Sequence, residues 1–174
     1  MTAIPFKENT VIVVFGASGD LARKKTFPAL FGLFREGYLS DTTRIIGYAR
    51  TKMGDEEFRS RIKEHFDLRD RSESLVVQFL KMCTYESAQY DKPEGYQKLT
   101  DGIEEFEASR GVDRPHRLFY LALPPAVFIP VAERVRKYCH PGEKGIARLI
   151  VEKPFGRDLA TARELQKKLA PLWK

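Results

Sequence analysis

The stretch Thr10-Val-Ile-Val-Val-Phe-Gly-Ala-Ser-Gly-Asp-Leu-Ala22 decides the fold of this 174-residue chain. Its first six residues are apolar or β-branched without interruption, which is typical of a strand buried on both faces of a sheet. Gly16 and Gly19 end the strand, and the apolar residues that follow recur with helical spacing. A buried strand, a glycine turn and a helix in direct succession predict the first unit of a parallel α/β sheet.

The glycine turn has the composition of a site for the phosphates of a dinucleotide. Glycines allow a tight turn and let the backbone approach a pyrophosphate, and Ala22 lets the helix pack closely on the strand. The helix N-terminus adds unpaired N–H groups and a partial positive charge. The spacing is GxxGxxA, a variant of GxGxxG, so the prediction depends on the strand before the turn and the helix after it.

The rest of the chain alternates between short apolar runs and longer segments of helical spacing. This alternation predicts an α/β fold with a doubly wound, Rossmann-type parallel sheet and right-handed crossovers. Pro28 is expected to kink or break the first helix. The helical material between residues 51 and 81 is more than one crossover needs, which suggests an insertion. The predicted strands are 10–15, 44–49, 81–85, 118–123 and 147–151, and the predicted helices are 20–36, 56–66, 74–80, 95–109, 127–138 and one that follows Asp158.

The end of the second predicted strand favours NADP over NAD. A site for NAD usually carries Asp or Glu at this position, which binds the ribose hydroxyl. Here the strand ends in Tyr48-Ala49-Arg50, without an acid. The planar guanidinium of Arg50 is suited to the 2′-phosphate of NADP, so Arg50 is a predicted cofactor-binding residue.

Composition excludes several other classes of protein. Hydrophobic residues make up 43% and charged residues 31% of the chain, as in an ordinary globular domain. No apolar run approaches the roughly 20 residues that cross a bilayer, and the N-terminus does not have the pattern of a signal peptide. Cys83 and Cys139 lack metal-ligand spacing and the three histidines are scattered, so we expect reduced thiols, no metal site and a cytoplasmic location.

The net charge of +6 fits small anionic ligands better than nucleic acid. Residues 1–50 carry a net +3 and residues 117–174 a net +7, whereas residues 51–116 carry −4. No basic run is interleaved with aromatic residues, and neither a helix-turn-helix nor a zinc-finger pattern occurs. We therefore expect no nucleic acid and no membrane among the partners.

Four motifs become specific when they are taken together. They are GASGDLA at 16–22, GYAR at 47–50, RLFYLALPP at 117–125 and VEKPFGRDL at 151–159. In this order they resemble the N-terminal coenzyme-binding region of the glucose-6-phosphate dehydrogenase family, and residues 24–39 are similar to its fungal members. The resemblance extends from about Asn9 to the end of the chain.

The resemblance implies an NADP-dependent oxidoreductase of the oxidative pentose phosphate pathway. The family oxidises glucose 6-phosphate to 6-phosphogluconolactone by hydride transfer to NADP, and the full enzyme is expected to be a homo-oligomer. Ser18 and Arg50 would contact the 2′-phosphate, and residues 122–124 would pass along the nicotinamide half. The residues that the resemblance assigns to the pyrophosphate are Gly16, Ala17, Ser18, Gly19, Asp20, Leu21, Ala22 and Arg23.

Lys153 is the residue to which the resemblance gives most chemistry. It would lie between the coenzyme and the sugar phosphate and contact both, where small displacements of the reacting carbon are costly. Pro154 would be a cis proline that aims this lysine. Phe128 stands where some relatives have a tyrosine that lines the cofactor, so a hydroxyl is absent there.

The family's later motifs do not occur in this sequence. They are a strand that grips the sugar phosphate and a histidine that acts as general base in a second, α+β domain for substrate binding and dimerisation. We therefore expect residues 1–174 to form an NADP-binding domain without that second domain and without the last strand of the sheet. Such a chain should bind NADP without turnover, and it contains no predicted catalytic residue.

Two alternatives stay open at this point. The chain could be a stand-alone NADP-binding or regulatory module, or an unrelated Rossmann enzyme such as an extended reductase or epimerase. The latter usually need a Tyr-x-x-x-Lys pair, which we expect this chain to lack. An unpaired sheet edge and the apolar face formed by Leu165, Leu169 and Leu172 further predict self-association.

Overall fold

The strand that opens the sequence motif, β1 (Val11–Phe15), lies at the centre of a five-stranded sheet in the computed structural model. The structure describes residues 8–68, 73–153 and 156–173. The strand order is β3-β2-β1-β4-β5, and all four pairs are parallel. The chain thus winds outward from β1 in both directions, which confirms the predicted Rossmann-type topology. The other strands are β2 (Arg44–Ala49), β3 (Cys83–Ser87), β4 (His116–Leu121) and β5 (Ile146–Val151).

The register brings the carboxyl ends of the strands level at one edge. Phe15 pairs with Tyr48 on one side and with Leu121 on the other, and Leu121 pairs with Val151. The residues that follow these four positions therefore emerge side by side. Ligands of open parallel sheets bind at this edge, where the strand order reverses.

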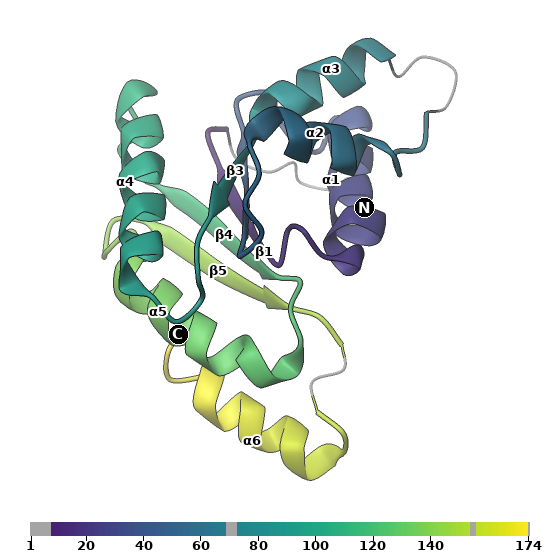
Figure 1. Cartoon of the computed structure of the whole chain (residues 1–174). Coiled ribbons are helices and arrows are strands. Elements are labelled where there is room, and N and C mark those ends of the chain that lie inside the picture. Colours follow the sequence, from purple (N-terminus) through teal and green to yellow (C-terminus); the bar gives the residue numbers. More distant parts are fainter. Residues whose placement is uncertain (1–7, 69–72, 154–155, 174) are drawn as a thin grey trace.

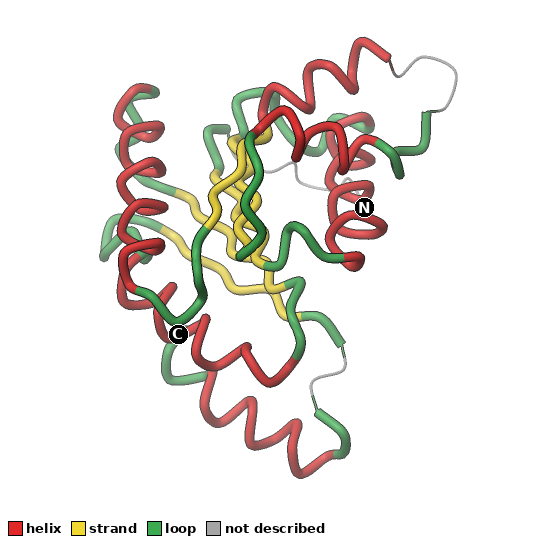
Figure 2. The backbone as a smooth tube through the Cα atoms, in the orientation of Figure 1, coloured by secondary structure: helices red, strands yellow, loops and turns green. Residues whose placement is uncertain are grey.

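Helices cover both faces of the sheet (Figure 1, Figure 2). One face carries α1 (Phe27–Arg35), α2 (Asp55–Lys63) and α3 (Glu73–Met82). The other carries α4 (Pro93–Ser109) and α5 (Phe128–Tyr138), with α6 (Leu159–Leu169) lying beyond α5. Each face encloses its own core of apolar side chains.

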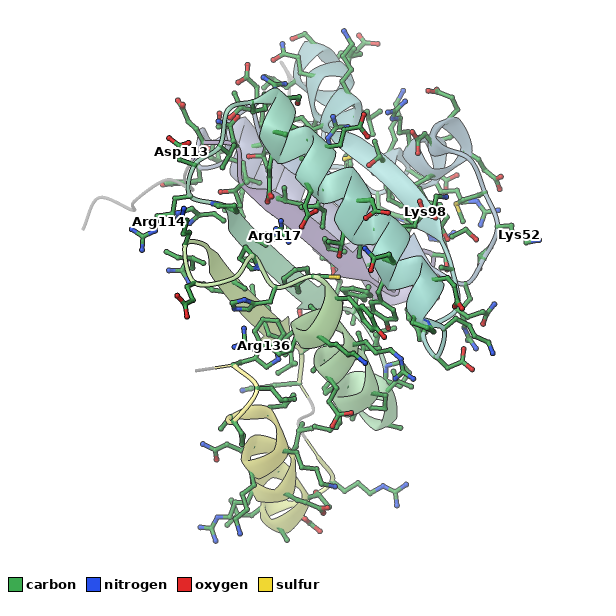
Figure 3. The ribbon with its side chains drawn as sticks, turned by 90° about the vertical axis from the view of Figure 1, so that its left-hand side faces the viewer. Lys52, Lys98, Asp113, Arg114, Arg117 and Arg136 are labelled. Carbon is green, nitrogen blue, oxygen red and sulfur yellow. The ribbon has the colours of Figure 1, made fainter. Side chains whose placement is uncertain are left out.

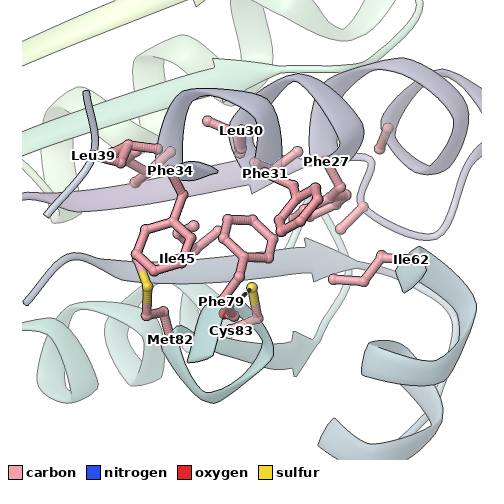
Figure 4. Packing of buried hydrophobic residues seen from close by; sticks show 14 of the residues in the cluster. Phe27, Leu30, Phe31, Phe34, Leu39, Ile45, Ile62, Phe79, Met82 and Cys83 are labelled. Atoms are coloured by element: carbon pink, nitrogen blue, oxygen red, sulfur yellow. Dashed lines mark hydrogen bonds between the residues drawn. The ribbon is translucent and has the colours of Figure 1, made fainter. Parts of the chain in front are cut away.

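The core under α1 is rich in phenylalanine (Figure 4). Phe31 stacks on Phe66 with ring centroids 4.6 Å apart, and Phe79 meets Phe31 edge-on at 5.6 Å. The segment suspected to be an insertion contributes much of this core, because α2 and α3 form the crossover from β2 to β3 and bury Phe58, Ile62 and Phe79 there. The third strand begins at Cys83, two residues later than predicted, because Lys81 and Met82 complete α3.

Pro28 breaks the first helix, as predicted. Residues Ala22–Thr26 form a π-helix in which the N–H of Phe27 donates to the carbonyl of Ala22, and Pro28 opens α1. Pro28 has no N–H to donate and its ring would crowd the carbonyl of the preceding turn. The wider π turn accommodates both, and such turns are frequent at functional sites.

The last helix begins where its sequence signal lies. The Asp158 carboxylate accepts a hydrogen bond from the Thr161 N–H at 2.9 Å, and the Thr161 hydroxyl accepts one from the Asp158 N–H at 3.1 Å, which completes a capping box.

Between α6 and β5 lies an open apolar groove of about 500 Å³, lined by Leu149, Val151, Leu159, Leu165, Leu169 and Trp173 among others. Self-association through this face stays a prediction, which light scattering on the pure chain would test. Among the described residues, no helix is long and apolar enough to cross a bilayer.

A buried ion pair joins β4 to α4, and its arginine, Arg117, is labelled in Figure 3. Arg117 on β4 donates from Nε and Nη2 to the two carboxylate oxygens of Glu107 at 2.8 and 2.6 Å, and from Nη1 to the carbonyl of Cys139 at 2.8 Å. Both side chains are almost fully buried. Removing one partner would leave the other charge buried and unpaired, which is strongly destabilising.

We predict that Glu107→Gln lowers the free energy of unfolding by about 3 kcal/mol, because Arg117 then keeps its charge without a buried counter-ion. Glu104→Gln is the matched control, since the Glu104 carboxylate lies 4.0 Å from the same guanidinium but its side chain is 63% exposed. The control should cost less than about 1 kcal/mol. Urea denaturation measures both, and equal effects of the two variants would contradict the assigned role of the buried pair.

Candidate cofactor-binding site

The glycine turn is fixed between the ends of two neighbouring strands. Gly16 has a φ of +80°, and a Cβ on it would lie 2.1 Å from the carbonyl oxygen of Ala122 after β4. The N–H groups of Gly16 and Ala17 donate to the carbonyl of Tyr48 on β2 at 2.9 and 3.3 Å, and the Ala122 N–H donates to Phe15 at 3.0 Å. Only glycine combines this backbone conformation with so close an approach.

The helix that follows presents free donors at the same edge. The Arg23 N–H donates to the Gly19 carbonyl at 3.1 Å, so Gly19 accepts the first helical hydrogen bond. The N–H groups of Asp20, Leu21 and Ala22 therefore have no carbonyl of a preceding turn to bind. Such donors, together with the positive end of the helix dipole, suit a phosphate group.

The side chains of the turn divide into packing and polar residues. Ala17 and Ala22 are buried, so they serve the close packing of helix on strand. Asp20 is exposed and pairs with Arg23 at 2.8 Å and with Lys24 at 3.3 Å. These two partners, of which Lys24 has the larger effect, hold the pKa of the Asp20 carboxyl below its usual value. Arg23 and Lys24 thus contribute less positive charge to the turn than the sequence suggests.

Arg50 and Ser18 lie close together where β1 and β2 end. Arg50 directly follows β2 and is exposed, with its Cζ 6.0 Å from the centre of the Tyr90 ring. The Thr51 hydroxyl donates to Ser18 Oγ at 3.2 Å, and the Tyr85 hydroxyl donates to the Thr51 carbonyl at 2.6 Å. A guanidinium and two hydroxyl groups are thereby gathered beside the glycine turn.

Tyr90 is a site residue that the sequence does not reveal. Its hydroxyl accepts a hydrogen bond from the Gly16 N–H at 3.0 Å while its ring lies below the Arg50 guanidinium. Burial raises the pKa of Tyr90 to about 12, so the hydroxyl stays protonated at neutral pH. Tyr90 comes three residues after β3 and belongs to no recognisable motif. Its role becomes visible only when the loop after β3 is placed next to β1.

Lys153 lies on the other side of the glycine turn, beyond β4, where it follows the end of β5. The side chain of Lys153 is exposed two residues beyond Val151, at the same edge as Gly16. β2 and β5 are three strand spacings apart, so Arg50 and Lys153 emerge about 14 Å from each other across the sheet. The glycine turn lies between these two cations.

Two neighbours of Lys153 complete the description of this side. Next to Lys153, Glu152 accepts a hydrogen bond from the Tyr120 hydroxyl, and burial and Glu152 raise the pKa of Tyr120 to about 12. Pro154 lies outside the described residues. Leu123 continues past β4 with its side chain near Gly16. Phe128 is buried in the core under α4 and α5, so its ring packs inward and does not line the edge.

The expectation that the chain lacks a Tyr-x-x-x-Lys pair is wrong, because Tyr48 and Lys52 have that spacing. Tyr48 is fully buried in β2, and burial raises the pKa of its hydroxyl strongly. Lys52 is exposed beyond the strand. A buried phenol of raised pKa is poorly placed for proton transfer to a bound substrate.

The chain is similar to known proteins of one family. The family model described as "Glucose-6-phosphate dehydrogenase, NAD binding domain" matches residues 13–174. "Glucose-6-phosphate 1-dehydrogenase" of Saccharomyces cerevisiae is 58% identical over 174 residues, which is 98% of this chain and 34% of that protein. "Glucose-6-phosphate 1-dehydrogenase, cytoplasmic isoform" of Solanum tuberosum is 44% identical over 93% of this chain and 33% of its own length.

A solved structure agrees with these relatives. It is described as "Glucose-6-phosphate dehydrogenase in complex with its substrate glucose-6-phosphate", and it superposes with a TM-score of 0.94 at 55% identity. The match covers 99% of this chain and 36% of the solved chain. The present chain therefore spans about a third of the length of the relatives it matches.

We predict that Gly16→Ala lowers the free energy of unfolding by more than about 3 kcal/mol, because a positive φ and a clash with a backbone carbonyl add together. Gly37→Ala is the matched control, since Gly37 has the same φ of +80° with open space around its Cβ position. The control should lose only about 1–2 kcal/mol. Denaturation of both variants separates the contact from the conformation, and equal losses would show that the contact with Ala122 is unimportant.

Proposed function

Because this chain belongs to the glucose-6-phosphate dehydrogenase family, we propose that it is the NADP-binding domain of an enzyme that oxidises glucose 6-phosphate to 6-phosphogluconolactone. The observation that carries the choice of NADP is the position of Arg50 beside Ser18 and Thr51 at the end of β2. No carboxylate follows β2 before Asp55, so nothing there would repel a 2′-phosphate.

The residues of the glycine turn fit the pyrophosphate of this cofactor. The free N–H groups of residues 20–22 supply hydrogen-bond donors, and Arg23 brings a guanidinium whose Nε is buried without a hydrogen-bond partner. The buried Ala17 and Ala22 keep the helix close to β1, so the donors hold one position. Arg50 and Ser18 would bind the 2′-phosphate through charge-assisted hydrogen bonds.

Lys153 would act at the other end of the cofactor. When bound, NADP supplies the hydride acceptor. The ammonium of Lys153 can donate hydrogen bonds to sugar-phosphate oxygens, and the bond between Tyr120 and Glu152 steadies the backbone next to it. Glucose 6-phosphate is supported as the substrate by the names of the matched relatives and by the solved complex. The cytoplasmic isoform among the relatives supports a cytoplasmic location.

We predict that Arg50→Ala weakens the binding of NADP by about tenfold to a hundredfold, which corresponds to the loss of a charge-assisted hydrogen bond. The affinity for NAD should change much less, because NAD has no 2′-phosphate. Lys52→Ala removes the same charge from an exposed neighbour and serves as the control. Titration calorimetry with both cofactors measures the ratio, and equal weakening of NADP and NAD would contradict the assignment.

We further predict that the pure 174-residue chain binds NADP but does not reduce it in the presence of glucose 6-phosphate. His116 opens β4, at the sheet edge opposite the glycine turn, and His140 follows the residue whose carbonyl binds Arg117 near that same edge. Neither imidazole can therefore take a proton from a substrate held at Lys153. Absorbance at the NADPH band follows the reaction, and NADPH formation above a protein-free control would contradict the prediction.

A further inference from the structure

A polar pocket lies at the edge of the sheet opposite the candidate cofactor site. Its volume is about 260 Å³, and three cations line it from three different elements. Arg44 begins β2, Lys81 is in the last turn of α3, and Arg110 follows the end of α4. The remaining lining residues are Asp41, Thr42, Thr43, Gln78, Met82 and Phe106.

The three cations have no ion-pair partner among the described residues. Arg44 and Arg110 share one aromatic platform, with their Cζ atoms 5.0 and 5.6 Å from the centre of the Phe106 ring. Lys81 and Arg110 also stabilise the negative ends of their helices, but Arg44, in a strand, has no such role. With Asp41 as the single acidic side chain of the lining, the pocket keeps a positive excess that favours an anion.

Thr43 supplies an independent observation. It is 2% exposed, it lines the pocket, and its Oγ1 is buried without a hydrogen-bond partner. A buried hydroxyl without a partner is unfavourable, and most such groups in folded proteins are satisfied. An anion oxygen in the pocket would accept the hydrogen bond that Thr43 can donate.

We propose that this pocket, formed by Arg44, Lys81, Arg110 and Thr43, binds a small phosphate-bearing anion. Arginine and lysine side chains at the rim would neutralise the phosphate, and Thr43 would bind an oxygen at the base. The volume of about 260 Å³ equals roughly nine water molecules at about 30 Å³ each, which is enough for a phosphate group with a small organic substituent. The proposal does not depend on the cofactor site, which lies at the other end of the strands.

Inorganic phosphate is the probe that tests the pocket, titrated into the chain with NADP at saturation so that the cofactor site is filled. We expect saturable binding of one phosphate per chain. Arg110→Gln and Lys81→Gln, both at exposed positions, should each weaken it about tenfold, the loss of one charge-assisted contact. Lys144→Gln removes an exposed cation outside the pocket and should leave the affinity unchanged.

Thr43→Val separates a ligand contact from a structural one. Valine has nearly the shape of threonine, and the hydroxyl has no partner in the protein, so stability to urea should not fall while phosphate binding weakens. A loss of stability with unchanged phosphate affinity would overturn the role of Thr43. The proposal as a whole fails if phosphate does not bind saturably to the NADP-saturated chain, or if Lys144→Gln weakens phosphate binding as much as Arg110→Gln.

Discussion

The contact between Gly16 and the carbonyl of Ala122 is the constraint on which the rest of the cofactor edge depends. The chain can turn after β1, between β2 and β4, only because Gly16 has no side chain. A Cβ at this position would lie 2.1 Å from the Ala122 carbonyl oxygen. The turn places Gly16 and Ala17 against the Tyr48 carbonyl and starts the helix at Gly19. The direction of the free N–H groups of residues 20–22 therefore depends on the close contact between Gly16 after β1 and Ala122 after β4.

The parallel register of the strands brings the candidate site residues to the same edge of the sheet as the glycine turn. Phe15, Tyr48, Leu121 and Val151 are level, so the residues just beyond them form one row along the edge. Arg50 and Lys153 stand at opposite ends of this row with the glycine turn between them. An extended molecule with a phosphate at one end and a reactive ring at the other would fit such a row, in keeping with the dinucleotide sites of other sheets with this topology.

The sequence was sufficient for the order of the elements and for the glycine turn, because both depend on local patterns. The continuously apolar run at 10–15, the glycine at 37 and the aspartate at 158 each mark a boundary that the structure keeps within one residue. Tyr90 and the pair of Arg117 with Glu107 could not be found in this way. Their partners lie 74 and 10 residues away, and nothing in the local pattern indicates that the two segments meet.

The distribution of charge shows why a net value is a poor guide to anion sites. Arg23 and Lys24 stand in a segment of positive net charge, yet Asp20 pairs with both. Lys81 and Arg110 belong to residues 51–116, where acids outnumber bases, yet they make no ion pair among the described residues. A cation without an internal partner keeps its full charge for a ligand, and whether it has such a partner depends on the fold. Arg50 lies exposed above the Tyr90 ring and Arg44 lies against the Phe106 ring, and neither makes an ion pair among the described residues. The two arginines stand at opposite ends of the same strand, β2.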